Sequence, residues 1–241
     1  QSLGASIPKQ TRNSTKMSNI IVKSIPNTIT CLNIASGCVA IAFAFAGQIQ
    51  WASVAILAAA IFDFCDGAVA RALKAYSPIG AELDSLCDVV SFGVAPAAMV
   101  YTLLPAPACY FALAIPVCGA LRLARFNVET SKVEGFIGMP IPANALFWIG
   151  MAALWQAHDP AQSADWTYGL MILLVALTMV APVHLPSLKF HDFKLGRENN
   201  PRYLIILITI AMVCWLGLPR FAVAIAIYFL YGAIATLANR R

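Results

Sequence analysis

Charged residues are scarce in this chain, and their scarcity excludes an ordinary soluble domain. Of the 241 residues, 60% are hydrophobic and only 11% are charged, whereas a soluble domain carries about 25% charged residues. The hydrophobic runs are continuous and lack the alternation of apolar and polar residues that membrane β-strands show, which argues against a β-barrel. The sequence therefore predicts an all-α, polytopic membrane protein.

The chain also lacks the residue patterns of a soft-metal site. Its three histidines are scattered, and its seven cysteines show no C-x-x-C spacing. Neither pattern indicates a zinc site. Since the cysteines lie within hydrophobic runs or at their ends, we expect small apolar residues rather than disulfide partners.

Long polar stretches are few, and hydrophobic runs dominate the chain. Eight runs approach the length of about 20 residues that crosses a bilayer. They lie at about 27–47, 51–74, 81–104, 108–126, 141–157, 167–185, 202–217 and 220–238. We expect one integral membrane domain at residues 25–241. Residues 1–24 should form an N-terminal cytoplasmic segment, partly disordered or folded as an amphipathic helix.

The basic residues are distributed unevenly about the predicted spans. Fifteen of the sixteen lysines and arginines fall on one side, and Arg220 is the exception. The positive-inside rule places that side, with both termini, in the cytoplasm, which agrees with an even number of spans. This arrangement accounts for the net charge of +5 without a nucleic-acid partner.

Four aspartates, Asp63, Asp66, Asp84 and Asp88, lie inside the second and third hydrophobic runs. One carboxylate near the bilayer centre costs roughly 2.5–3.5 kcal/mol. Four without compensation would cost on the order of 10 kcal/mol, which approaches the whole stability of a typical protein. Divalent metal ions are the expected source of compensating charge.

The spacing of the aspartates places them around one cavity. Asp63 and Asp66 are three residues apart, and Asp84 and Asp88 are four apart, so each pair shares one helix face. The short loop at about 75–79 makes the two helices antiparallel neighbours, so their polar faces can meet in the cytoplasmic half of the membrane. Carboxylate clusters suit Mg²⁺, Mn²⁺ or Ca²⁺, and two such ions would clamp a displacement at phosphorus.

Small and basic residues follow the first aspartate pair. Gly67 and Ala70 would let a bulky ligand approach the helix backbone, and Arg71 lies where it could pair with a phosphate. Polar contacts between helices without chemistry are the alternative interpretation of the acidic faces.

The run from Asp63 to Asp88 reads D-x-x-D-G-x-x-A-R, eight residues, G-x-x-x-D-x-x-x-D. It resembles the signature of the CDP-alcohol phosphotransferase family at every defining position. The resemblance implies transfer of a substituted phosphoryl group from a CDP-linked donor to an alcohol, with release of CMP. The fold expected is about eight transmembrane helices with a six-helix catalytic core and an active site open to the cytoplasm and inner leaflet.

The same resemblance implies a role for each site residue. Asp63, Asp66 and Asp84 would hold two metal ions, either Mn²⁺ or Mg²⁺ with Ca²⁺ as an alternative. Asp88 would contact a metal and act as general base, so Asp84 and Asp88 are the catalytic candidates. The CDP-binding candidates are Asn27, Thr30, Asp66, Gly67, Ala70, Arg71 and Gly80.

Three further segments, 78–97, 122–127 and 135–144, resemble the membrane-embedded phosphatidylserine synthases within that family. The similarity covers roughly residues 25–200 and implies CDP-diacylglycerol and L-serine as substrates. Arg122, Arg125 and Asn127 could bind the serine carboxylate or a donor phosphate, or anchor the helix end at the membrane surface. The resemblance also implies a homodimer, surrounded by membrane lipids in the cell (inner) membrane.

Other functions fit parts of the same pattern. A relative with the same chemistry could use glycerol-3-phosphate or inositol phosphate, although either would call for an extra anion site. A divalent-cation transporter could use aspartates within the membrane as a transit site, but it has no need of the pocket at Gly67, Ala70 and Arg71. A lipid-binding scaffold without catalysis is the third alternative.

Overall fold

The computed structural model describes residues 9–128, 136–158, 166–185 and 218–238. Helices dominate these residues, and the strands among them form one antiparallel pair in which Phe136 lies opposite Leu185. The predicted all-α class is confirmed at this level. The elements in chain order are α1 (Lys9–Phe45), α2 (Ile49–Ala72), α3 (Pro78–Asp88), the π-helix η1 (Val89–Val94), α4 (Ala95–Leu103), the 3-10 helix η2 (Ala108–Leu113), α5 (Ala114–Val128), β1 (Phe136–Ile137), α6 (Ile141–His158), α7 (Trp166–Leu177), β2 (His184–Leu185) and α9 (Arg220–Ala238).

Four helical segments among the described residues are long and apolar enough to cross a membrane. They are Ser24–Phe45, Ile49–Ala72, Pro78–Leu103 and Ala108–Val128, and they match the first four predicted spans. The helices Trp166–Leu177 and Phe221–Ile234 are apolar but shorter, and the predicted span at 202–217 lies outside the described residues. The total of eight spans therefore stays a prediction.

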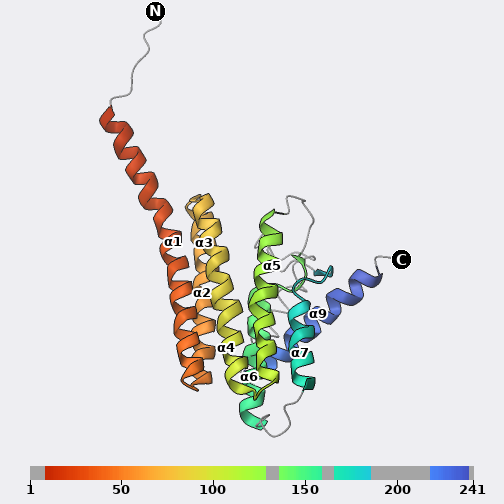
Figure 1. Ribbon diagram of the computed structural model, residues 1–241. Helices are drawn as coiled ribbons and strands as arrows, with labels where there is room; N and C mark the ends of the chain where they lie inside the picture. The colour runs from red at the N-terminus through yellow and green to blue at the C-terminus, as the bar shows by residue number, and fades with distance from the viewer. Residues whose placement is uncertain (1–8, 129–135, 159–165, 186–217, 239–241) are drawn as a thin grey trace, which may run out of the picture.

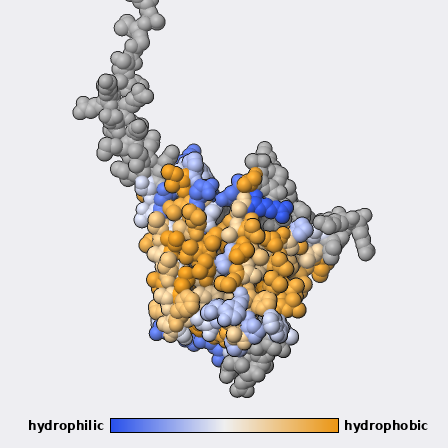
Figure 2. All heavy atoms as spheres, viewed as in Figure 1, coloured by the Kyte–Doolittle hydropathy of each residue, from blue (hydrophilic) through white to orange (hydrophobic). Residues whose placement is uncertain are grey.

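The helices form a bundle with a hydrophobic outer surface. Helices α1 and α2 pack against each other and against the joined α3 and α4, while α5, α6, α7 and α9 extend the bundle on the other side (Figure 1). A hydrophobic band lies between polar ends on the face shown in Figure 2. On α2, the side chain of Phe64 is 69% exposed whereas that of Asp66 is 5% exposed. The helix thus turns its apolar face outward, as expected in lipid, and its acids inward.

Helix α1 is longer than the first predicted span. It runs unbroken from Lys9 through Pro26 to Phe45, and its first turns extend beyond the rest of the bundle (Figure 1). Residues 9–24 of the predicted N-terminal segment are therefore helical and continuous with the span. The functional boundary at residue 24 stays a prediction.

The third span changes helical geometry directly after Asp88. Residues Val89–Val94 form a π-helix, in which the N–H of Ala95 donates to the carbonyl of Val90. Pro96 follows in the first turn of α4, and because proline has no N–H, an α-helical bond is lost there. Single π-helical turns occur inside α-helices, frequently at functional sites, and the span continues through this one into α4.

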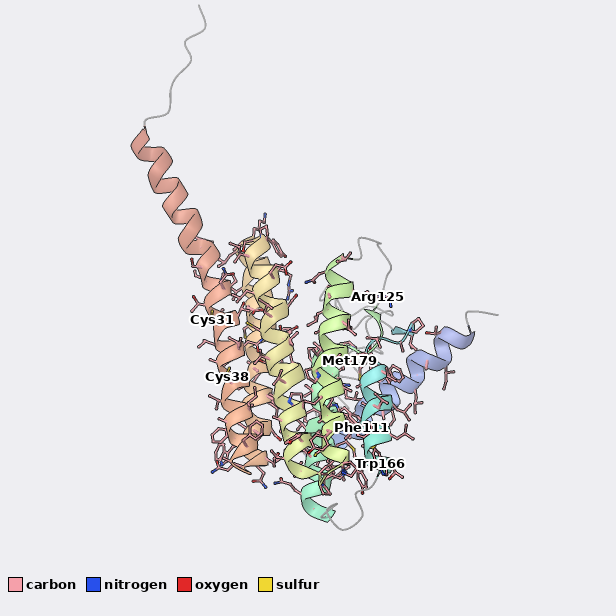
Figure 3. The ribbon with its side chains drawn as sticks, viewed as in Figure 1. Cys31, Cys38, Phe111, Arg125, Trp166 and Met179 are labelled. Atoms are coloured by element: carbon pink, nitrogen blue, oxygen red, sulfur yellow. The ribbon has the colours of Figure 1, made fainter. Side chains whose placement is uncertain are left out.

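Close contacts at small residues hold the bundle together. Gly37 of α1 lies against Ser91 of η1, and a side chain at Gly150 of α6 would overlap the backbone of Ala222 in α9. Small residues permit such approaches between membrane helices, where packing rather than the hydrophobic effect holds helices together. The rings of Phe111 in η2 and Trp166 in α7 pack edge to face, with centroids 6.0 Å apart (Figure 3).

The predicted sixth span at 167–185 is wrong in its extent, because α7 ends at Leu177. The chain beyond it turns and pairs with the segment before α6. The N–H of Gly138 donates to Val183 O at 2.9 Å, and that of Met139 donates to Thr178 O at 3.0 Å. Pro182 lies in this turn, and it disfavours helix at its own position and at the residue before it.

A buried polar contact lies within α6. Trp148 and Asn144 are both fully buried, and the indole N–H of Trp148 donates to Asn144 Oδ1 at 2.8 Å. The amide of Asn144 also contacts Met139 Sδ at 3.7 Å. This contact ties the helix to the G-M-P-I-P segment before it.

Two glycines with nearly the same backbone angle test the close packing at Gly138. Gly138 has φ +74° and Gly47 has φ +73°, but a Cβ at Gly138 would overlap Met179 O, whereas nothing lies within 4 Å of one at Gly47. Alanine at either site bears a left-handed backbone cost of about 1–2 kcal/mol. Gly138→Ala should lose a further ~1–3 kcal/mol through overpacking, which thermal denaturation in detergent would show as a lower midpoint than for Gly47→Ala. Equal midpoints would contradict the described packing.

Candidate active site

A tight turn positions the two acidic helices. Residues 73–77 connect α2 to α3, and the hydroxyl of Ser77 accepts a hydrogen bond from the N–H of Gly80 at 3.0 Å. Pro78 occupies the first turn of α3, where its missing N–H is not needed. Capping of this kind starts α3 directly after the turn, so α2 and α3 are the antiparallel neighbours that the sequence predicted.

Three of the four aspartates come together across these helices. Carboxylate oxygens of Asp63, Asp66 and Asp84 lie within 4.8 Å of one another. Asp66 is buried, and Asp63 and Asp84 are half-buried. The spacing argument therefore predicted the arrangement of these three side chains correctly.

Asp88 lies one turn beyond Asp84, at the end of α3, and its side chain is 8% exposed. It is not part of the group of three whose oxygens lie within 4.8 Å. It interacts electrostatically with Asp63 and Asp84 on one side and with the guanidinium of Arg122 on the other. Asp88 thus interacts both with the acidic cluster and with a cationic group of α5.

The acidic cluster fits a divalent cation. Asp63 and Asp84 approach closely enough to share a hydrogen bond, and two carboxylates at that range repel unless a proton or a cation lies between them. Asp84 and Asp88 each have a buried Oδ1 without a hydrogen-bond partner among the described residues. Since the group of three offers carboxylate oxygens alone, its chemistry suits Mg²⁺, Mn²⁺ or Ca²⁺.

Helix α1 contributes two polar side chains beside the cluster. The hydroxyl of Thr30 is buried and donates to Asp66 Oδ2 at 2.6 Å, although Pro26 O also lies within reach at 3.1 Å. Asn27 lies against Gly80, where an added Cβ would come within 2.9 Å of Asn27 Oδ1. Both α1 residues named from sequence therefore lie beside the acidic helices.

The glycine, alanine and arginine that follow Asp66 line the exit of α2. The side chain of Arg71 is exposed, whereas Gly67 and Ala70 are half-buried. Arg71 folds back along the helix, so that its Nη1 would lie 3.4 Å from a Cβ on Gly67. A guanidinium next to an open stretch of backbone is a suitable contact for a phosphate.

The three acceptor candidates on α5 differ in their surroundings. Arg122 is only 9% exposed, and its guanidinium lies 5.6 Å from the ring centre of Phe126. Asn127 Nδ2 donates to Ser85 Oγ at 3.0 Å, next to Asp84 in the sequence. Arg125 is exposed on α5 (Figure 3). The guanidinium of Arg122 interacts electrostatically with Asp88.

Sequence reasoning missed Asn33 on α1. Its side chain is fully buried, and neither its Oδ1 nor its Nδ2 has a hydrogen-bond partner among the described residues. A signal was present, because Asn33 follows Thr30 by three residues in an otherwise apolar run and therefore shares its helix face.

Comparison with known proteins identifies the family. Residues 23–181 match the CDP-alcohol phosphatidyltransferase family. A relative from Methanocaldococcus jannaschii is 36% identical over 213 residues, covering 88% of this chain and 93% of its own. A relative from Bacillus subtilis is 39% identical over 182 residues, covering 73% and 98%, and one from Helicobacter pylori is 32% identical over 219 residues, covering 88% and 90%.

All three relatives carry the name CDP-diacylglycerol–serine O-phosphatidyltransferase. The matched region contains the whole aspartate signature and the helices α2, α3 and α5 that form the site. The chain belongs to the CDP-alcohol phosphatidyltransferase family.

Proposed function

We propose that this protein transfers a phosphatidyl group from CDP-diacylglycerol to L-serine, which yields phosphatidylserine and CMP. Family membership supports the reaction class, and the names of its relatives support serine as the acceptor. The observation that carries the proposal is the meeting of three carboxylates within 4.8 Å between two apolar helices. Such a cluster is costly in a membrane unless it binds cations.

The metal ligands in this proposal are Asp63, Asp66, Asp84 and Asp88. They would hold two ions of Mn²⁺ or Mg²⁺, with Ca²⁺ as an alternative. When bound, the ions would neutralise charge on the phosphate and orient it for displacement. The buried Oδ1 atoms of Asp84 and Asp88, which have no hydrogen-bond partner among the residues described, would supply ligand positions.

The CDP end of the donor would lie against α1, α2 and the start of α3. Gly67, Ala70 and Gly80 leave room for the nucleotide, and Arg71 binds a phosphate. Asn27 contacts the Gly80 turn and lines the same pocket. Thr30 positions a metal ligand in this proposal, because its hydroxyl donates a hydrogen bond to Asp66.

Asp88 is the proposed general base, beside Asp84. It takes the proton of the serine hydroxyl, and the serine oxygen bonds to the donor phosphorus nearer the lipid. The bond from that phosphorus to the CMP oxygen breaks, and CMP leaves. The charge of Arg122 favours the charged carboxylate of Asp88, whereas burial and the neighbouring aspartates oppose it.

Serine also brings a carboxylate, which needs a cationic partner. Arg122 is buried and interacts electrostatically with Asp88, so one residue could hold the acceptor carboxylate within reach of the base. Arg125 and Asn127 lie further along α5 and would bind the acceptor or a donor phosphate from the exposed side.

The topology proposed for the whole chain has eight spans, six of which form the catalytic core within residues 25–241. Both termini and the active site would face the cytoplasm of the cell (inner) membrane, as the distribution of basic residues predicts. Residues 1–24 would lie on the cytoplasmic side. A homodimer is the expected assembly.

A rival acceptor such as glycerol-3-phosphate or inositol phosphate is less well supported, because the three relatives above carry the serine enzyme's name. A divalent-cation transporter is disfavoured by family membership.

Two threonines on α1 test the contact with Asp66. Thr30 donates to that carboxylate, whereas Thr28 donates to Ser24 O within its own helix. Thr30→Val should weaken Mn²⁺ binding about tenfold, a typical cost of losing a group that orients a metal ligand. Thr28→Val is the matched control and should bind as the wild type does. Equal Mn²⁺ dissociation constants for the two variants would contradict the role of Thr30.

An acceptor assay tests the function itself. Purified protein with CDP-diacylglycerol and Mn²⁺ should convert labelled serine to labelled phosphatidylserine with equimolar CMP, and unlabelled glycerol-3-phosphate or inositol phosphate should not compete.

In the same assay, Asp88→Asn should lower kcat about 10²–10⁴-fold, because general-base catalysis contributes that much. Arg122→Gln should raise the KM for serine by more than Arg125→Gln does.

Each arm of the acceptor assay has a contrary outcome. If the protein formed product from glycerol-3-phosphate but not from serine, the proposed acceptor would be wrong and the proposed reaction class would stand. Metal flux into proteoliposomes without CMP release would show a transporter rather than an enzyme. Wild-type turnover in Asp88→Asn would contradict the role of Asp88 as general base.

A further inference from the structure

Asn33 is a buried polar side chain that the proposed chemistry does not use. Its side chain is 0% exposed, and both polar atoms of its carboxamide lack a hydrogen-bond partner among the described residues. Buried amides are nearly always hydrogen-bonded in native proteins, and exceptions call for an explanation such as an unseen ion or water.

The contacts between α1 and the third span set the depth of Asn33. Near the start of α3, Asn27 lies against Gly80, and further along, Gly37 lies against Ser91. The two segments run in the same direction, so Asn33 is level with residues 86–87, directly before Asp88. The hydroxyl of Ser91 donates to Asn33 O at 3.0 Å, which holds this part of α1 close to the turn after Asp88.

The contact between α1 and α2 gives a second, independent estimate of the depth of Asn33 in the bundle. Thr30 donates to Asp66, and these helices run in opposite directions. The residue three after Thr30 is therefore level with the residue three before Asp66. Those residues are Asn33 and Asp63, and Asn33 shares the helix face of Thr30. Asn33 thus lies at the depth of Asp63 and within one helical turn of the depth of Asp88.

A second buried asparagine shows what a structural amide looks like in this protein. Asn144 is also 0% exposed, but its Oδ1 accepts from Trp148 at 2.8 Å and its Nδ2 contacts Met139 Sδ. Asn33 has no such partner within the described part of the chain, and Asp88, close to its depth, also has an Oδ1 without one there.

We propose that Asn33 is an uncharged member of the metal site. Its Oδ1 contacts a divalent ion, or a water molecule on that ion, and its Nδ2 donates to a phosphate oxygen held by the same ion. Amide oxygens are regular ligands of hard divalent cations. The inference rests on the proposed function, because it requires the aspartates to bind metal.

A purely structural role for Asn33 makes the opposite prediction. If the carboxamide had no ligand, an apolar side chain of similar size would serve better, because a buried polar group without a partner is destabilising. Asn33→Leu separates the two roles, since it keeps the branched shape of the side chain and removes the polar atoms.

The test measures Mn²⁺ binding to the full-length purified protein, by electron paramagnetic resonance of the free ion, together with thermal denaturation without metal. Asn33→Leu should raise the Mn²⁺ dissociation constant about tenfold while the metal-free midpoint stays the same or rises. Asn144→Leu is the matched control. It should lower the metal-free midpoint, because Trp148 loses its acceptor, and leave the Mn²⁺ dissociation constant unchanged.

Asn33→Asp keeps an oxygen ligand and guards against a Leu variant that fails to fold. It should bind Mn²⁺ at least as tightly as the wild type and gain more in midpoint when Mn²⁺ is added. Wild-type affinity in Asn33→Leu, or no added gain in Asn33→Asp, would overturn the inference. If the wild type itself binds no Mn²⁺, the proposed function fails with it.

Discussion

Four carboxylates in a low-dielectric interior repel each other, and the helices around them are arranged to offset that repulsion. Thr30 of α1 donates a hydrogen bond to Asp66, and Arg122 of α5 places a cation beside Asp88. Even with these two contacts, buried oxygens of Asp84 and Asp88 have no hydrogen-bond partner in the part of the chain that the structure describes. Bound cations would supply the remaining positive charge. Because they would relieve the repulsion between the buried acids, that repulsion favours metal binding.

The bundle holds the site through close helix contacts. Gly37 and Ser91 bring α1 against η1, which sets the depth of Thr30 and Asn33 relative to the acids. The π-helical turn after Asp88 lets the third span continue past Pro96. A stable scaffold of this kind matters for catalysis, since metal ligands displaced by even an ångström lose much of their effect.

The acidic cluster could be predicted from the sequence because it depends on short-range features, namely residue spacing within a helix and the length of one loop. Spacings of three and four residues define a helix face, and a five-residue turn forces α2 and α3 to be neighbours, so the meeting of Asp63, Asp66 and Asp84 followed from the pattern. The first four spans followed from hydrophobicity alone. The prediction of Asn27 and Thr30 beside the acidic helices came from a family resemblance, not from spacing.

Other features depend on contacts that no local pattern specifies. The end of α7 at Leu177 reflects pairing of Gly138 and Met139 with the chain after the helix. The importance of Asn33 becomes visible only when the registers of α1 with α2 and of α1 with the third span are known. Arg122 and Arg125 look alike in the sequence, and burial distinguishes them.

The most direct test of this account is to locate the metal. Anomalous diffraction from crystals grown with Mn²⁺ and CMP should show two peaks between α2 and α3, each within about 2.0–2.6 Å of oxygens from Asp63, Asp66, Asp84 or Asp88. Peaks elsewhere in the protein, with none between these aspartates, would contradict it.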